Sequence, residues 1–187
     1  MKKVVLVLAI GISMGASAQS YSVMPDGLKD AANPEKTFLV INVEGKTAKQ
    51  LYDEAIKYVN VTYKNPSAVM RGNINGEFLS FATHTNTFYI DTYLKRNISV
   101  EYMTSLTFKD GKVKYEIHEL EMVCNETRPQ VNLHFSGGML QYSIYNNSGK
   151  LRKEDTKKDL ESHFNYSIIA IKKYLDGKSS VALDKDF

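Results

Sequence analysis

Two strand-like stretches that meet at the dipeptide Asp110-Gly111 constrain the fold more than any other feature of the sequence. Apolar residues and threonine occupy every second position on both sides of it, a period typical of strands with one buried face. Asp-Gly favours a two-residue hairpin turn because both residues of such a turn need positive φ. The pairs that this turn brings opposite one another are Phe108 with Val113, Leu106 with Tyr115 and Thr104 with Ile117. The sequence therefore predicts an antiparallel hairpin with one apolar face.

The alternation shifts by one residue near His118 and Glu119. Beyond this point the apolar positions are Leu120 and Met122, which the register of the turn would place on the polar face. One extra residue in the strand restores the pattern, so we expect a β-bulge at His118-Glu119. The expected pairs are then Tyr102 with Leu120 and Val100 with Met122.

Other elements have local signals of their own. The stretch 38–43 is apolar on both strand faces, which is typical of a strand covered on both sides. A helix follows it, where Thr47 and Gln50 have the spacing of a capping box. Asn75-Gly76 indicates a second hairpin with a two-residue turn. The pairs expected around that turn are Met70 with Phe81 and Gly72 with Leu79.

The second half of the sequence predicts a further hairpin and a long helix. Residues 125–150 contain two short alternating stretches around Ser136-Gly137-Gly138, which indicate an extra hairpin. The final helix has Thr156 as its N-cap residue and Gly177 just beyond its last turn. Its apolar stripe consists of Leu160, Phe164, Ile168, Ile171 and Leu175.

The first 18 residues have the features of a secretory signal peptide. Lys2 and Lys3 precede an apolar run over residues 4–14, and Ala16-Ser17-Ala18 has the form that a signal peptidase accepts. We expect cleavage after Ala18 and a periplasmic or secreted protein. The apolar run is shorter than the roughly 20 residues of a membrane-spanning helix, so we expect no membrane span. The rest of the chain divides into an N-terminal arm (19–36), a single domain (37–177) and a C-terminal tail (178–187).

Charge and cysteine content argue against two classes of protein. Without Lys2 and Lys3 the chain has 22 basic and 21 acidic residues, a balance of +1. Nucleic-acid binding needs clustered basic residues, so we expect no nucleic-acid partner. Cys124 is the only cysteine and cannot form an internal disulfide. It is interpreted as a buried small residue or, alternatively, as an intermolecular link.

Residues with catalytic or metal-binding chemistry do not converge in the sequence. His118, Glu119 and Glu121 lie on one strand, which sends neighbours to opposite faces, whereas zinc needs three or four convergent ligands. Cys124 lacks the flanking residues of a catalytic nucleophile. The sequence also has no phosphate-binding loop, metalloprotease motif or hydrolase elbow. We therefore expect no enzyme, and assign no catalytic, metal or cofactor-binding residues.

Two groups of residues are candidates for binding. Tyrosines on the predicted strands could form an amphipathic binding face, because tyrosine joins a large ring to a polar hydroxyl. Alternatively, they reflect the preference of half-buried strands for aromatic residues. The residues of this candidate face are Tyr93, Tyr102, Tyr115, Tyr142 and Tyr145. The second candidate is a ligand pocket between the sheet and the final helix, lined by Phe164, Ile168 and Ile171.

The order of elements is strand, helix, antiparallel strands and closing helix, which predicts an α+β domain. The run from FLVINVEGKTAKQLYDEAIKYVN through VMRGNINGEFLSF to ISVEYMTSLTFKDGKVKYEIHELEM resembles the exported bacterial family of domain of unknown function 4468. The resemblance covers residues 37–122 and the last helix, and implies a TBP-like fold without catalytic residues. With the extra hairpin, the same order is also similar to helix-grip proteins, which close a curved sheet around an apolar ligand.

These observations lead to two hypotheses for function. The first is a non-enzymatic exported module that binds a protein or an envelope component through its open sheet face or a strand edge; a homodimer is one such assembly. The alternative is a carrier of a small apolar ligand in the pocket between sheet and final helix. An exposed apolar patch favours the first hypothesis, and an enclosed pocket favours the second.

Overall fold

The computed structural model describes residues 19–91, 96–125, 129–134 and 142–178. Its centre is a five-stranded antiparallel sheet with the strand order β3-β7-β6-β5-β4. The strands are β3 (Phe38–Asn42), β4 (Met70–Ile74), β5 (Phe78–Asp91), β6 (Arg96–Lys109) and β7 (Lys112–Cys124). The expected α+β fold with an antiparallel sheet is confirmed.

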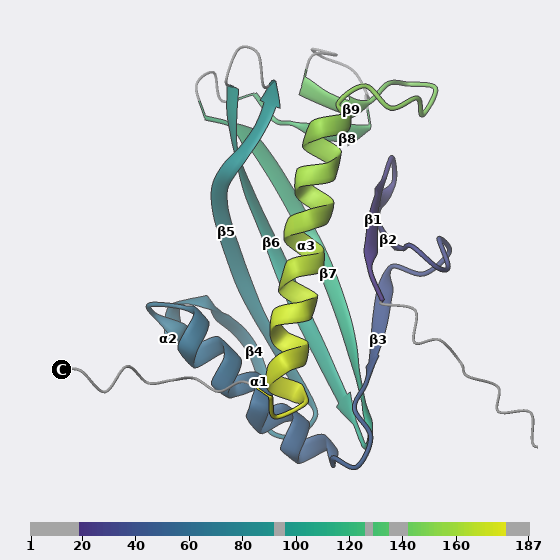
Figure 1. Cartoon of the computed structure of the whole chain (residues 1–187). Helices are drawn as coiled ribbons and strands as arrows, with labels where there is room; N and C mark the ends of the chain where they lie inside the picture. Colours follow the sequence, from purple (N-terminus) through teal and green to yellow (C-terminus); the bar gives the residue numbers. More distant parts are fainter. Residues whose placement is uncertain (1–18, 92–95, 126–128, 135–141, 179–187) are drawn as a thin grey trace, which may run out of the picture.

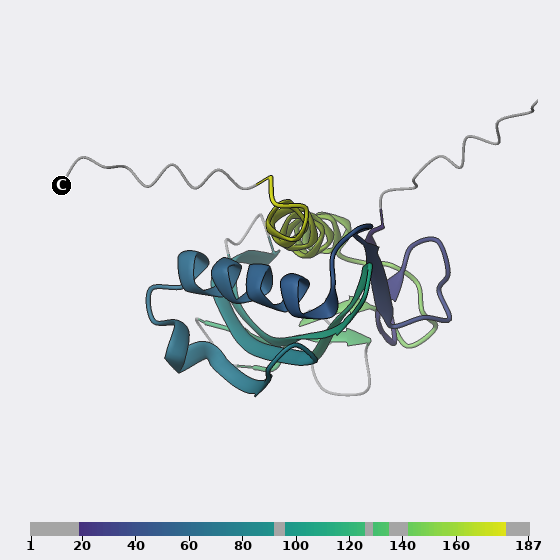
Figure 2. The ribbon, with the colours of Figure 1, turned by 90° about the horizontal axis from the view of Figure 1, so that it is seen from below.

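Two long helices lie on the same, concave side of this sheet (Figures 1 and 2). Helix α1 (Ala48–Thr62) crosses one end of the sheet, and α3 (Glu154–Leu175) runs along the strands (Figure 1). The short helix α2 (Pro66–Val69) links α1 to β4. Neither long helix covers the opposite, convex face of the sheet (Figure 2).

The hairpin between β6 and β7 has the register that the sequence predicts. Phe108, Leu106 and Thr104 lie opposite Val113, Tyr115 and Ile117. The predicted bulge is also present: the register shifts after Met103–His118, and Glu119 adopts a left-handed φ of 52°. The shift restores the pairing of Val100 with Met122, so that Met122 is buried. The inserted residue therefore keeps the apolar side chains of a long strand on one face.

The hairpin between β4 and β5 differs from the expected one in the length of its turn. Ile74 pairs with Phe78, so the turn has three residues, with Gly76 at a φ of 79°. A second irregularity at Arg71 compensates for the longer turn, and Met70 lies opposite Phe81 as predicted. Gly72 lies opposite Ser80, so its predicted pairing with Leu79 is wrong.

Both long helices begin and end as their sequences allow, with one exception. The capping box of Thr47 and Gln50 starts α1, as predicted. Helix α3 begins at Glu154 without a side-chain cap, so the predicted capping role of Thr156 is wrong. The Thr156 hydroxyl donates instead to the carbonyl oxygen of Tyr89, at 2.7 Å. Gly177 ends the helix at a φ of 70°, as expected. The predicted apolar stripe of α3 is buried throughout.

The segment 19–36 is not the arm that the sequence suggests. It forms a hairpin of β1 (Tyr21–Met24) and β2 (Gly27–Asp30), with Tyr21, Val23 and Leu28 buried. The Tyr21 hydroxyl donates to the carbonyl oxygen of Tyr115 at 3.0 Å, which ties the hairpin to β7. The hydrogen bonds of this hairpin to Tyr115, Glu161 and Asn165 join residues 94 or more positions apart, and a local sequence pattern cannot reveal them.

The predicted antiparallel hairpin within residues 125–150 is wrong. Strands β8 (Asn132–His134) and β9 (Ser143–Tyr145) pair in parallel and form a separate two-stranded sheet beside the end of β7. The Val131 amide donates to the carbonyl oxygen of Met122 at 2.8 Å. The expected signal peptide (1–18) and most of the expected tail (179–187) lie outside the described residues.

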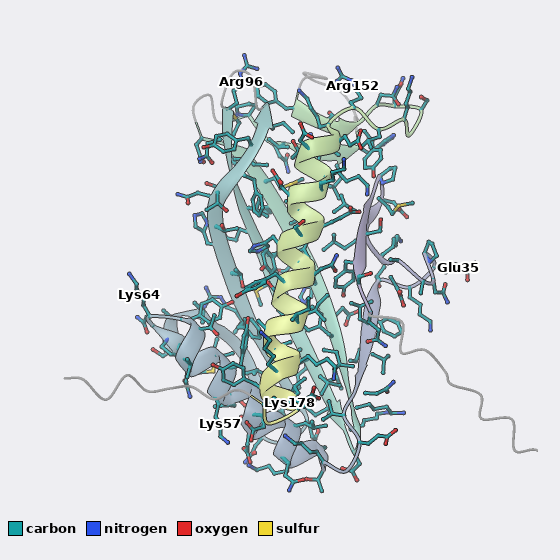
Figure 3. All side chains as sticks on the ribbon, in the orientation of Figure 1. Glu35, Lys57, Lys64, Arg96, Arg152 and Lys178 are labelled. Carbon is teal, nitrogen blue, oxygen red and sulfur yellow. The ribbon has the colours of Figure 1, made fainter. Side chains whose placement is uncertain are left out.

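Charged side chains such as Glu35, Lys57 and Lys64 project from the periphery of the fold (Figure 3). Among the described helices, none combines the length and the apolar character that a membrane crossing requires.

Candidate functional site

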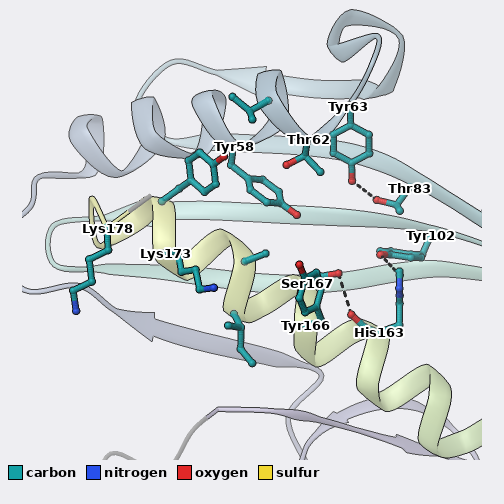
Figure 4. A pocket seen from close by; sticks show the side chains of 14 residues that line it. Tyr58, Thr62, Tyr63, Thr83, Tyr102, His163, Tyr166, Ser167, Lys173 and Lys178 are labelled. Atoms are coloured by element: carbon teal, nitrogen blue, oxygen red, sulfur yellow. Dashed lines mark hydrogen bonds between the residues drawn. The ribbon is translucent and has the colours of Figure 1, made fainter. Parts of the chain in front are cut away.

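An open groove of about 1000 Å³ lies between α1 and α3, and we call it the α1–α3 groove (Figure 4). Its floor comes from Thr83 of β5 and Tyr102 of β6, while the two helices form its banks. The helices contact each other at one end, where the rings of Tyr58 and Tyr174 meet edge to face at 5.5 Å. The α1 bank consists of Tyr58, Val61, Thr62 and Tyr63, and the α3 bank of His163, Tyr166, Ser167, Ile169, Ala170, Lys173, Tyr174 and the following Lys178.

Hydrogen bonds join the floor of the groove to both banks (Figure 4). The Tyr63 and Thr83 hydroxyls lie 2.6 Å apart, and the Tyr102 hydroxyl lies 2.9 Å from His163 Nε2. Burial raises the pKa of Tyr63 to about 12 and also raises the pKa of Tyr102. Burial lowers the pKa of His163. Tyr63, Tyr102 and His163 are therefore uncharged near neutral pH.

The banks of the groove carry exposed apolar side chains. Val61 is 53% exposed, Ile169 56% and Tyr166 70%, and all three line the groove. The other exposed large apolar residues in the described part of the chain are Ile74, at 55%, and the less exposed Tyr89 and Val123, at 38% and 37%. Scattered exposed apolar residues are normal, whereas a group along one concavity is typical of a binding surface.

The charges in the groove have one sign. Among the described residues that line it there is no carboxylate, and Lys173 and Lys178 lie together toward one end (Figure 4). Lys178 Nζ lies 3.9 Å from a carboxylate oxygen of Asp176. A bound molecule could therefore place an anionic group at this end without repulsion.

The tyrosine face predicted from the strands is not a surface. Tyr102, Tyr115, Tyr142 and Tyr145 are buried, and Tyr93 lies outside the described residues. Burial is the outcome that the preference of strands for aromatic residues implies. Only Tyr102 reaches the groove, where its hydroxyl meets His163.

The predicted ligand pocket is occupied by packed side chains. Phe164, Ile168 and Ile171 are buried against the sheet, and they line no cavity found among the described residues. The groove uses the neighbouring face of α3 instead. Its residues could have been noticed in the sequence because Tyr166 and Ile169 are apolar but fall outside the buried stripe.

The residues considered for chemistry stay apart from the groove. His118 Nε2 lies 2.8 Å from the Ser105 hydroxyl on the convex face, and Cys124, the single cysteine of the sequence, is buried. Within the described residues, no cluster of three His, Cys, Asp or Glu side chains is arranged to hold a metal ion.

Comparisons with known proteins show what the fold resembles. No protein-family profile matches the chain, and no curated protein matches it. A solved structure of a DUF4468 family protein from Bacteroides ovatus ATCC 8483 is similar, with a TM-score of 0.55 at 14% identity, covering 77% of this chain and 86% of that one. A TBP-like protein from Parabacteroides distasonis ATCC 8503 gives a TM-score of 0.47 at 12% identity, covering 72% and 90%. The fold expected from the resemblance to domain of unknown function 4468 is therefore confirmed: the chain shares the fold of the Bacteroides ovatus protein.

Proposed function

We propose that this protein is a non-enzymatic exported binding module of the cell envelope, which holds an extended apolar segment of another protein in the α1–α3 groove. One observation carries the proposal: Val61, Tyr166 and Ile169 gather exposed apolar surface on both banks of a single groove. Tyrosine on the floor and banks supports this role, because its rigid ring gives contact area at low entropy cost.

The chemistry of the groove favours binding over catalysis. Its lining, as far as the structure describes it, includes no carboxylate and no thiol, and His163 is engaged with Tyr102. General acid–base catalysis works best with a group whose pKa lies near the operating pH. Burial moves the pKa of His163 down and that of Tyr102 up, away from neutral pH.

The open shape favours a protein segment over a small molecule. Small-ligand sites enclose roughly 70–90% of the ligand surface, whereas this groove is open to solvent. The space beneath α3 is filled by Phe164, Ile168 and Ile171. A carrier of a small apolar ligand remains the second candidate, because a volume of about 1000 Å³ would accept a lipid-sized molecule.

Photo-crosslinking in the native host tests the proposal. A benzoylphenylalanine residue would replace Tyr166 or Ile169 in the groove, and as a control it would replace Val123, which is exposed outside the groove. Adducts of one defined protein mass at the two groove positions, and none at the control, are expected. An adduct of twice the chain mass would identify the partner as a second copy.

Native mass spectrometry of the same protein separates the two candidates. A lipid-sized mass on the monomer that disappears with Ile169→Asp would overturn the protein-partner proposal in favour of the carrier. Equal adducts at Tyr166, Ile169 and Val123 would refute the groove as the binding site.

A further inference from the structure

A second hollow lies on the convex face of the sheet, on the side away from α1 and α3. Its volume is about 370 Å³, and it is formed where β3, β6 and β7 run side by side near the β6–β7 turn. The lining residues are Phe38, Val40, Thr107, Lys109, Lys112 and Lys114.

The positive charges around this hollow are poorly balanced. Lys109 lies directly opposite Lys112 in the register, and like charges at such positions repel each other. No described carboxylate makes an ion pair with either of them. Lys114 has a partner, because Glu116 lies 2.7 Å from its Nζ. The nearby Asp110 is engaged elsewhere, since it accepts a hydrogen bond from the Ala48 amide at 2.8 Å. The hollow therefore has a net positive charge.

The floor between these lysines is apolar. Phe38 and Val40 are half-buried, and two ammonium groups lie over the Phe38 ring, Lys114 Nζ at 4.8 Å and Lys36 Nζ at 6.0 Å from its centroid. Lysine stems cover apolar surface while their charged ends stay at the rim. A cationic rim around an apolar floor is complementary to an amphiphile with an anionic headgroup and an apolar tail.

We propose that this end of the convex face docks on an anionic lipid surface, with Lys36, Lys109, Lys112 and Lys114 contacting lipid phosphate groups and Phe38 facing the acyl boundary. Clusters of lysine are attracted to anionic leaflets, and aromatic side chains favour the membrane interface. Farther along the same face the described strands carry negative charge, because Glu101 lies directly opposite Glu121. This separation of charge orients the domain with the lysine end toward the lipid. The α1–α3 groove lies on the other side of the sheet and stays accessible.

Vesicle binding tests the proposal with the chain that begins at Gln19, which keeps every described residue. The probes are vesicles of phosphatidylglycerol with phosphatidylcholine, and vesicles of phosphatidylcholine alone. Each lysine near an anionic surface strengthens binding about five-fold, so Lys109→Gln with Lys112→Gln should weaken binding to the anionic vesicles about 25-fold. Lys57→Gln on α1 with Lys64→Gln just beyond the end of α1 removes the same charge elsewhere and should leave binding unchanged.

The variant with Lys109→Gln and Lys112→Gln is expected to stay folded. Removing two like charges that face each other should keep or raise the thermal midpoint, so a loss of binding cannot come from unfolding. Equal binding by the two double variants, or equal binding to both kinds of vesicle, would overturn the proposal. Displacement by inorganic phosphate but not by chloride at the same ionic strength would assign the hollow to free phosphate instead. Displacement by polyglutamate alone would assign it to an acidic peptide.

Discussion

The carboxylate of Glu161 and the side-chain amide of Asn165 join the N-terminal hairpin to α3, so Glu161→Ala should loosen the hairpin. Glu161 Oε1 accepts hydrogen bonds from the Val23 amide at 2.8 Å and from the Ser22 hydroxyl at 2.9 Å. The same oxygen receives the ammonium group of Lys157 one turn earlier on the helix. The carboxylate side chain is only 21% exposed, so water replaces these contacts poorly.

The magnitude follows from these contacts. A hydrogen bond to a charged group contributes about 1.5–3 kcal/mol, and a buried donor left without an acceptor costs about 1–3 kcal/mol. The Lys157 pair adds at most about 1 kcal/mol because it is partly solvated. The contributions overlap once water reaches the detached Val23 amide, so Glu161→Ala should lower the free energy of unfolding by about 2–3 kcal/mol. Glu161→Gln keeps a neutral acceptor and should lose about half as much.

Urea unfolding followed by circular dichroism measures the change, and hydrogen exchange of the Val23 amide locates it. Glu154→Ala is the matched control, because Glu154 forms an exposed pair with Lys158 on the same helix. We expect no measurable loss of stability for this control. The reasoning is refuted if the Glu161 and Glu154 variants unfold alike while the Val23 amide stays protected in both.

Three further predictions concern pH, strain and the core. Burial alone would raise the pKa of Glu161, but hydrogen bonds from Lys157, Val23 and Ser22 offset it and hold the pKa below its ordinary value of 4.5. The stability that this carboxylate contributes is therefore present above pH 4.5 and is lost as the pH falls below it. The free energy of unfolding should fall more steeply with decreasing pH for the wild type than for Glu161→Gln. Glu119→Gly should stabilise the protein by about 1 kcal/mol, because φ is 52° there; an unchanged or lower thermal midpoint would contradict this. Phe164→Ala should lower the free energy of unfolding by about 3–5 kcal/mol, and Ile169→Ala, on the exposed bank, by less than about 0.5 kcal/mol; similar losses in urea unfolding would contradict the assignment of the groove.

Local patterns in the sequence determined the elements and much of their register. The β6–β7 hairpin follows from a period of two and from Asp110-Gly111, and the bulge at Glu119 follows from a single shift in that period. The buried stripe of α3 and the capping box at Thr47 are equally local. Such features are readable because the residues that decide them lie within a few positions of one another, and one apolar face must be buried.

Contacts between distant parts of the chain decided the rest. The β1–β2 hairpin depends on Glu161 and Asn165, each more than 130 residues away. Strands β8 and β9 pair in parallel, so no tight turn joins them and no turn motif in the sequence could predict the pairing. The α1–α3 groove exists only because two helices meet at Tyr58 and Tyr174 and leave the sheet uncovered beyond that contact. The sequence by itself determined which side chains are apolar and where the central strands and the two long helices run. Only the tertiary structure decided which apolar side chains were left exposed, because that depends on which faces of distant elements pack together.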